Sequence, residues 1–305
     1  MVSVILLSYN QKDFIADTLK SILNQKTDFE FEILVFDDGS DDGTQQIIQR
    51  FEDSNSCIKS FLSKNNEGNK KNGAKLLNLK LKKYIAFIDG DDLWINKNKL
   101  QNQINFLENN PAYIGCFHDA EIKDLIKSDD YQPKKYFKFY SQMFRYNSEY
   151  FIWDAIDRVI IPNSTVVYKS KFMDFNKIQK LKKYKLSGNW MMSIFMLLNG
   201  KLKYFNKTWS IYNDHSAGIT KKVKSSDFNF NNIIFFKELL IDTEFKGLKK
   251  NLYFAIAKEY KNILYSYIEA SKHERLKLSL QYFKYSFLAI SKEAKYFIKD
   301  NNEKS

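Results

Sequence analysis

Short apolar runs alternate with helically spaced apolar residues over the first part of the chain. Sets such as Ile15, Leu19 and Ile22 have the spacing of an amphipathic helix. Continuous apolar runs are typical of parallel strands, because helices cover both faces of such strands. Val2–Leu7, Phe31–Phe36 and Tyr84–Ile88 are runs of this kind, and Ile58–Leu62 is predicted to be a further strand. The alternation predicts a doubly wound α/β sheet.

Polar residues mark where several of these elements begin or end. Asp13 is placed to cap the first helix, and either Asp42 or Thr44 is placed to cap the second. A further helix is expected to stop at Asn110-Pro111, and Ile161–Tyr168 is predicted to be another strand. The aromatic and charged region of about residues 125–160 is interpreted as part of the acceptor side of a site.

From Asp227 onward the apolar pattern becomes helical throughout. Two stripes are formed by Leu252, Ile256, Ile263 and Tyr267, and by Leu280, Phe283, Phe287, Ile290, Ala294 and Phe297. We therefore expect a catalytic domain over residues 1–220 and a helical region over residues 221–305.

Composition and charge narrow the class of protein. The 305 residues are 44% hydrophobic with few Gly and Pro, as in a folded chain, and the formal net charge is +12. Cys57 and Cys116 lack a metal-binding spacing and suit a reducing compartment. We expect no signal peptide and no membrane-spanning helix, which needs ~20 apolar residues. A cytoplasmic protein that rests in solution or on the inner face of a membrane is the expectation.

Three carboxylates, Asp89, Asp91 and Asp92, directly follow the apolar run 84–88. Carboxylates this close repel one another unless a cation lies among them, and oxygen ligands suit Mg²⁺ or Mn²⁺. Gly90 allows a sharp turn that lets the flanking side chains face one ligand. The alternative is a solvated acidic loop, since Asp and Gly are ordinary turn residues.

Polar clusters also follow two earlier strands. Ser8–Asn10 ends the first strand, and the pair Asp37-Asp38 ends the second. In doubly wound sheets, ligands bind at the carboxyl ends of the strands, so these clusters predict a shared site. The Asp pair could accept hydrogen bonds from a nucleobase or ribose, or could cap the next helix; both roles remain open.

Residues 2–25, 31–44 and 84–94 together resemble the inverting family 2 glycosyltransferases, which have the fold called GT-A. Residues 99–111 extend the resemblance to bacterial enzymes that decorate surface polysaccharides and lipooligosaccharides. The similarity is ordered along residues 1 to about 220 and does not cover the helical region. It implies a Rossmann-like, mainly parallel sheet flanked by helices, followed here by a C-terminal α-helical extension.

The resemblance also implies roles for individual residues. Tyr9 and Asp38 match positions that contact the base of a nucleotide sugar, and Asp89 is the first carboxylate of the DxD motif. Asp91 matches a position that contacts ribose or metal, and Asp92 matches one that binds the ion bridging the diphosphate. A metal would neutralise the charge of the leaving diphosphate.

Other matches lie late in the aligned region. His215 matches a His near the metal, although a single His is more often structural. Asn189 stands where the family has its Asp general base, and Asn213 replaces an arginine that often precedes the late His. An amide cannot accept the acceptor's proton, so three explanations are open. The chain carries a substitution that traps substrate, a carboxylate such as Asp214 or Asp174 is the base, or the protein is a non-catalytic member.

The function that follows from the resemblance is metal-dependent, inverting transfer of a sugar. The donor would be a nucleotide sugar, namely a UDP-sugar, and the acceptor a glycan or lipid-linked glycan in cell-surface polysaccharide biosynthesis. A catalytically impaired sugar-nucleotide-binding member is the alternative. A sugar-phosphate nucleotidyltransferase would need a Gly-rich phosphate loop that the chain lacks. Nucleic acid is not an expected partner, because acidic strand ends repel phosphates.

The basic charge has a second interpretation. Residues 169–185 are rich in Lys, and the helical stripe of 280–297 carries Lys284, Lys292 and Lys295 on its other side. Peripheral contact with an anionic membrane would bring the protein to a membrane-borne acceptor. Alternatively, the tail packs on the catalytic domain or forms a contact within a homo-oligomer.

Overall fold

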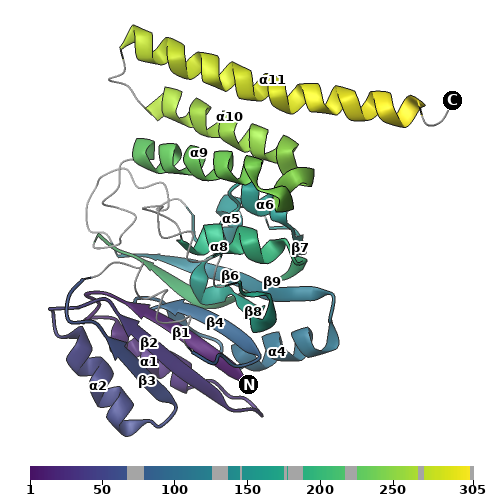
Figure 1. The fold of residues 1–305 in the computed structure, drawn as a ribbon. Coiled ribbons are helices and arrows are strands. Elements are labelled where there is room, and N and C mark those ends of the chain that lie inside the picture. Colours follow the sequence, from purple (N-terminus) through teal and green to yellow (C-terminus); the bar gives the residue numbers. More distant parts are fainter. Residues whose placement is uncertain are drawn as a thin grey trace. The chain divides into compact units, whose positions relative to one another are not determined.

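The computed structural model describes residues 1–66, 79–125, 137–144, 146–174, 177, 188–216, 225–266 and 271–302 (Figure 1). Nothing is described for the side chains of residues 188, 189, 225, 226 and 292–302. The chain separates into two compact units. The α/β unit comprises Met1–Ile152, Val159–Lys182 and Asn189–Ser216, and the helical unit comprises Trp153–Arg158, Lys183–Gly188 and Ala217–Ser305. Because residues 217–224 lie outside the described part, the domain boundary at residue 220 stays a prediction.

The first half of the sheet is parallel. Its strands are β1 (Val2–Ser8), β2 (Phe31–Asp37), β3 (Ile58–Leu62) and β4 (Tyr84–Asp89). They lie in the order β3-β2-β1-β4, and their apolar side chains form one buried cluster with the flanking helices. The four predicted strands are therefore confirmed. Leu7 lies beside Asp89 and Ser8 beside Asp37, so the carboxyl ends of β1, β2 and β4 share one edge.

The other half of the sheet is mixed. The order continues β8-β6-β9-β5, and β7 pairs with β9. These strands are β5 (Leu93–Trp94), β6 (Tyr113–Asp124), β7 (Glu149–Tyr150), β8 (Val167–Lys169) and β9 (Lys201–Asp214). The β6–β9 pair is parallel and the contacts of β8 are antiparallel. With helices around this sheet and a helical C-terminal region, the predicted fold class is confirmed.

The strand predicted over Ile161–Tyr168 is wrong in its extent. Only Val167 and Tyr168 of that range join β8, whereas Asn163–Thr165 form a 3-10 turn, η2. The cause is local, because the carbonyl of Pro162 accepts from both the backbone N–H of Thr165 at 3.1 Å and its hydroxyl at 2.7 Å. This turn places Asn163 beside the end of β4.

The helices that flank the sheet are α1 (Ile15–Leu23), α2 (Thr44–Ser54), α4 (Lys99–Asn109), α5 (Tyr140–Phe144) and α8 (Gly188–Leu197). The predicted stop of α4 at Asn110 is confirmed. Asp13 does not cap α1, because Phe14 occupies the cap position and the Gln11 carbonyl accepts from the first backbone N–H groups. For α2 the cap position is Gly43, so neither Asp42 nor Thr44 is the capping residue, although Asp42 accepts from the Thr44 backbone N–H at 2.9 Å just before the helix.

The helical unit contains α9 (Ser225–Ile241), α10 (Lys249–Ser266) and α11 (Lys272–Asn302), with the short η6 (Thr243–Leu248) between the first two. Helix α10 packs against both α9 and α11. Leu252, Ile256 and Ile263 are buried as predicted, while Tyr267 lies outside the described residues. The second predicted stripe is exposed from Leu280 to Ile290. No helix in the described ranges has an apolar stretch long enough to cross a bilayer.

A buried ion pair links α10 to the segment after α6 (Ile152–Ile156). The Arg158 guanidinium donates to Glu259 at 2.9 Å, and the side chain of Glu259 is 1% exposed. The Asn232 amide also donates to Glu259 at 3.1 Å, and the Phe228 ring lies 4.7 Å from the Arg158 guanidinium carbon. Arg158 itself has a left-handed backbone with φ 64°. This network ties three segments of the helical unit together.

Candidate functional site

Backbone hydrogen bonds bring the three predicted polar loops together. The Gly90 N–H donates to the Leu7 carbonyl at 2.8 Å, and the Asp38 N–H donates to the Ser8 carbonyl at 3.0 Å. The loops that follow β1, β2 and β4 are therefore neighbours at the carboxyl edge of the sheet. This is the position at which doubly wound sheets bind ligands.

The two members of the Asp37-Asp38 pair have different surroundings. Asp37 is fully buried and accepts from the backbone and hydroxyl of Ser40 and from the Gln45 amide, so it holds the turn before α2. Asp38 is 5% exposed and lies beside the end of β1. Tyr9, the other predicted base contact, is half-buried in the loop after β1. The contacts of Asp37 are structural, which leaves Asp38 as the candidate for contact with a nucleotide.

The loop after β4 is fixed from α1. The hydroxyl of Thr18 donates to the carbonyls of Gly90, at 2.8 Å, and Asp92, at 2.9 Å. A Cβ atom at position 90 would lie 2.3 Å from the side-chain oxygen of Gln11 and 2.9 Å from Ile15 Cδ1. A side chain at position 90 would therefore displace the ends of the Gln11 and Ile15 side chains, which pack closely against this turn.

The carboxylates at the end of β4 are buried. The Asn163 amide donates to both oxygens of Asp89, at 3.1 and 3.2 Å. Burial and, second, the charge of Asp91 raise the pKa of Asp89 to about 7. Asp92 is 1% exposed, and neither of its oxygens makes a hydrogen bond of normal geometry with the described residues, although the Ser164 hydroxyl and the Asn213 backbone N–H are near enough to offset part of the effect of burial on its pKa. Burial, then the charges of Asp91 and Asp89, raise the pKa of Asp92 well above its usual range.

His215 lies beside these carboxylates, as the resemblance implies. Its Nε2 atom is 2.9 Å from Asp91 Oδ2, and the rings of His215 and Phe14 stack with centroids 4.9 Å apart. The Asn213 amide, which stands where the family often has an arginine, donates to the Asp91 carbonyl at 2.5 Å. Asn213 thus fixes the backbone of the acidic loop against the end of β9.

The donor set suits a divalent cation that arrives with a phosphate ligand. Across the described residues, no group of three or more His, Cys, Asp or Glu side chains is already arranged around a common point. Mg²⁺ is, however, commonly held by one or two carboxylates together with substrate phosphates and water. The two unpartnered oxygens of Asp92, with Asp91 and His215 close by, fit that arrangement. The metal ligands Asp92, Asp91 and His215 stay a prediction.

The structure separates the candidates for the general base. Asn189 is the second residue of α8, and its side chain lies outside the described part. Asp214 is 3% exposed at the end of β9, next to His215. Asp174 follows β8, whose Lys169 pairs with Tyr84 at the start of β4, so Asp174 lies toward the opposite edge of the sheet. The geometry favours Asp214 over Asp174.

Several residues at the site escape sequence reasoning. Tyr212 and Tyr140 make an edge contact with ring centroids 5.4 Å apart. Burial, followed by the charges of Asp92 and Asp214, raises the pKa of the Tyr212 phenol. Thr18 and Asn163 are the other missed residues, and neither stands in a distinctive motif. A prediction of β9 as a strand would have placed Tyr212 near the acidic loop.

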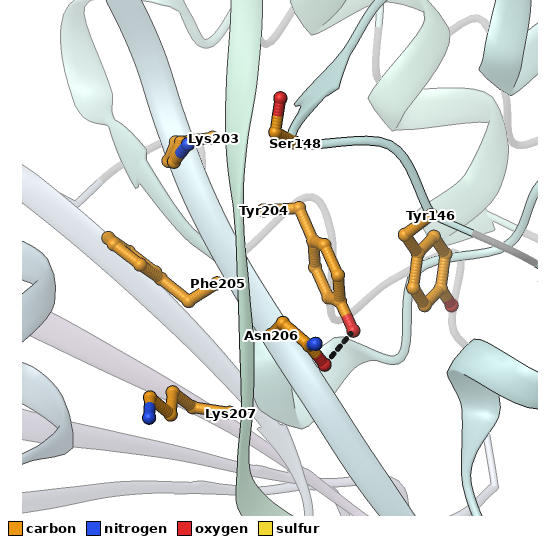
Figure 2. A pocket seen from close by; sticks show the side chains of 7 residues that line it. All are labelled: Tyr146, Ser148, Lys203, Tyr204, Phe205, Asn206 and Lys207. Atoms are coloured by element: carbon orange, nitrogen blue, oxygen red, sulfur yellow. Dashed lines mark hydrogen bonds between the residues drawn. The ribbon is translucent and has the colours of Figure 1, made fainter.

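A separate cavity of about 450 Å³ opens along the first half of β9. Figure 2 shows the rings of Tyr146 and Tyr204 on one side of the central strand ribbon and the side chains of Phe205 and Lys207 on the other. The register of β6 and β9 shifts here, so that His118 pairs with Phe205 and the next residue pairs with Thr208. The lining residues are Tyr146, Ser148, Lys203, Tyr204, Phe205, Asn206 and Lys207. The acidic loop lies toward the other end of β9, so this cavity is separate from it.

Comparison with known proteins relates this geometry to a family. Over 129 residues the chain is 39% identical to WfaP of Escherichia coli, named UDP-Glc:alpha-D-GlcNAc-diphosphoundecaprenol beta-1,3-glucosyltransferase. That match covers 41% of this chain and 49% of WfaP. Over 107 residues this chain is 38% identical to TuaG of Bacillus subtilis. The name of TuaG describes it provisionally as a teichuronic acid biosynthesis glycosyltransferase. That match covers 35% of this chain and 42% of TuaG.

The fold has solved counterparts. The crystal structure of S. aureus TarS 1–349 in complex with UDP-GlcNAc superposes with a TM-score of 0.65 at 18% sequence identity. The superposition covers 93% of this chain and 79% of that one. This likeness establishes a shared fold. Among the curated relatives compared, the match spans between 15% and 60% of the relative's length.

A match to a protein-family model identifies the family. The sequence model described as Glycosyl transferase family 2 matches residues 3–175, which include the loops after β1, β2 and β4 and the Asn163 turn. The acidic loop, the neighbouring strand ends and the fold all agree with that match. The chain belongs to glycosyl transferase family 2.

Proposed function

We propose that this chain transfers a sugar, with inversion, from a UDP-sugar to a glycan or lipid-linked glycan during the synthesis of a cell-surface polysaccharide. The observation that carries the proposal is the buried acidic loop at the end of β4. Asp92 holds two carboxylate oxygens away from water without a partner among the described residues, which favours a cation brought by a diphosphate.

Different residues around the acidic loop would bind different parts of the donor. Tyr9 and Asp38 lie at the neighbouring strand ends and would hold the nucleoside, while Asp91, Asp92 and His215 would hold Mn²⁺ or Mg²⁺. When bound, the cation supplies charge neutralisation for the departing diphosphate. Thr18 and Asn213 hold the backbone of the acidic loop in place.

The relatives support the choice of donor and acceptor. WfaP is named for a UDP-Glc donor and a diphosphoundecaprenol-linked acceptor, and TarS was crystallised with UDP-GlcNAc. TuaG is named for the synthesis of a surface polymer. A UDP-hexose donor and an acceptor that carries a lipid diphosphate are therefore the first substrates to test.

An acceptor hydroxyl needs a base to remove its proton as it attacks the anomeric carbon. Asp214, 3% exposed at the end of β9, is the carboxylate best placed for this role if Asn189 cannot fill it. If no carboxylate takes over, the chain is a sugar-nucleotide-binding member with little or no turnover. Asn189 at the family's base position is the observation that favours this second candidate.

Two measurements on the same preparation separate these outcomes. Thermal unfolding with UDP, GDP and dTDP, each with Mn²⁺ or with EDTA, tests for a metal-dependent UDP site. Product formation from UDP-Glc or UDP-GlcNAc with a GlcNAc-diphospholipid analogue tests for transfer. Stabilisation by UDP with Mn²⁺ and a glycosylated product supports the proposal, and stabilisation without product supports the second candidate. Equal stabilisation with EDTA, or by all three nucleotides, contradicts the proposed donor site.

A further inference from the structure

Helix α11 uses only one of its faces to join the helical unit. Tyr285 and Ala289 are 9% and 0% exposed, and they lie on the side that packs against α10. The Tyr285 ring stacks with Tyr260 at 5.9 Å between centroids and also contacts Tyr253 at 6.1 Å. The attachment of α11 to the unit is therefore provided by this side alone.

The opposite side of α11 carries an exposed apolar stripe. A helix turns about 100° per residue, so residues spaced alternately four and three apart align along one side, here opposite Tyr285 and Ala289. The stripe consists of Leu276, Leu280, Phe283, Phe287 and Ile290, whose exposed fractions are 59%, 59%, 64%, 69% and 58%. Single exposed apolar residues are ordinary on a protein surface, but a continuous row marks an interaction face.

The charge beside the stripe indicates what covers it. Lys277 and Lys284, each one position after a stripe residue, are exposed and lie along its flank. No Asp or Glu occurs in the sequence between residues 276 and 292. The whole chain carries a net charge of +12. An apolar row bordered by lysines and lacking carboxylates is complementary to an anionic lipid surface.

A second copy of the chain fits this face less well. Paired helices with this spacing place the flanking positions against each other, where Glu–Lys pairs normally select the partner. Here the flanks carry Lys277, Lys284, Ser279 and Ser286, so an antiparallel pair would oppose lysines and a parallel pair would oppose lysine with serine. Neither arrangement forms an ion pair.

We propose that the exposed face of α11 is a peripheral attachment site for an anionic membrane. The stripe enters the boundary between headgroups and acyl chains, and Lys277 and Lys284 contact anionic headgroups. The attachment would concentrate the protein where lipid-linked acceptors reside, a consequence that rests on the proposed function. The attachment itself depends only on α11.

Co-sedimentation of the full chain with vesicles tests the proposal. Binding is expected to vesicles of phosphatidylcholine mixed with phosphatidylglycerol, not to phosphatidylcholine alone, and to weaken as salt is raised. The double variant Leu280→Gln/Phe287→Gln should bind more weakly by a factor on the order of ten for each residue. Lys277→Gln/Lys284→Gln should lose about fivefold for each lysine.

Matched controls in the α/β unit isolate the effect of α11. Ile95→Gln removes an apolar residue that is 48% exposed, and Lys59→Gln/Lys97→Gln removes two exposed lysines; both should bind like the parent. Circular dichroism checks that every variant is folded. Sedimentation velocity without lipid tests the alternative partner, a second copy of the chain. If the parent is a dimer and Leu280→Gln/Phe287→Gln is a monomer, the stripe is a dimer interface.

The proposal is overturned by that dimer, by no binding to anionic vesicles at low salt, or by equal losses in the controls. Sugar transfer to a soluble acceptor reports separately on the proposed function. Vesicle binding without transfer leaves the attachment site standing, and transfer without vesicle binding removes it.

Discussion

Asp92 combines two properties that rarely occur together, near-complete burial and the absence of a partner within the described part of the chain. Without a cation this carboxylate destabilises the fold, because a buried unpaired polar group costs about 1–3 kcal/mol and a charged one more. Asp92→Asn should therefore raise the free energy of unfolding in EDTA while abolishing Mn²⁺-dependent binding of UDP. Urea unfolding and calorimetry measure the two effects.

Asp53→Asn, which alters an exposed carboxylate on α2, should change neither quantity and serves as the control. UDP affinity that is the same in Asp92→Asn as in the parent, with Mn²⁺ present, would remove Asp92 from the proposed metal site.

Asn189 sets a second test at the residue scale. Asparagine and aspartate are nearly the same size, so Asn189→Asp should leave donor binding intact and restore a proton acceptor at the family's base position. A positioned base contributes ~10²–10⁴-fold in rate, and kcat for transfer should rise within that range with KM for the donor little changed. If Asn189→Asp is no faster and Asp214→Asn loses activity, Asp214 is the base.

Lys99, the first residue of α4, is fully buried, and its ammonium lies 4.0 Å from the Trp94 ring centroid with no hydrogen-bond partner among the described residues. Burial lowers the pKa of Lys99 from 10.5 to about 7. Between these pH values the unfolded chain holds a proton that the folded chain lacks, so stability rises with pH across this window. Lys99→Met should flatten this rise and stabilise the protein at pH 7 by up to about 4 kcal/mol.

Denaturant unfolding at several pH values measures the slope. Lys97→Met, at an exposed position two residues earlier, should keep the parent's pH dependence. An unchanged slope in Lys99→Met would show that Lys99 keeps its usual pKa in the folded state.

At the scale of elements, the parallel half of the sheet follows from the sequence and the other half does not. Strands β1, β2 and β4 are largely apolar, because both of their faces are covered, whereas β3 is shorter and only Ile58 in it is buried. Strand β6 contains two polar residues, His118 and Asp119, within its buried stretch. These polar side chains interrupt the apolar pattern from which a buried strand is predicted. The Asp119 carboxylate can be buried because the hydroxyl and the backbone N–H of Ser141 donate to it. Ser141 lies 22 positions later, so a local sequence pattern cannot predict this contact.

Strand β9 was missed for a different physical reason. The bulge opposite His118 and Asp119 breaks its alternation of apolar and polar residues at Asn206 and Lys207. The site inherits this division. Motifs and resemblance predict Asp89, Asp91, Asp92 and His215, whereas Asn163 and Tyr212 reach the candidate site through elements that the pattern did not define.

The Arg158–Glu259 pair provides a test at the element scale. Removing one partner of a buried ion pair leaves an uncompensated charge and costs about 3–5 kcal/mol. Glu259→Ala should destabilise the helical unit by that amount, because Glu259 also accepts from Asn232. Arg158→Leu/Glu259→Leu should recover most of the loss. Urea unfolding of Arg158→Leu, Glu259→Leu and Arg158→Leu/Glu259→Leu measures the coupling, and additive losses would contradict it.

At the scale of the whole molecule, two compact units predict two separable unfolding transitions. UDP with Mn²⁺ should raise only the transition of the α/β unit, by about 2.7 kcal/mol at a ligand concentration 100 times Kd. Glu259→Ala should lower only the other transition. Differential scanning calorimetry resolves the two, and a single transition shifted by both changes would show that the units unfold together.

The antiparallel strand β8, inserted between β4 and β6, has a consequence for synthesis on the ribosome. Ala86 of β4 pairs with Val167, and Cys116 of β6 pairs with the same residue, so both strands emerge long before their common neighbour. Until then the nascent chain presents two unpaired strand edges, which are the features that favour aggregation. The last strand, β9, has 14 residues and emerges later still. It contains Asn213, which donates to the acidic loop. The edge of the sheet that carries the candidate site is therefore completed only after most of the α/β unit has been translated.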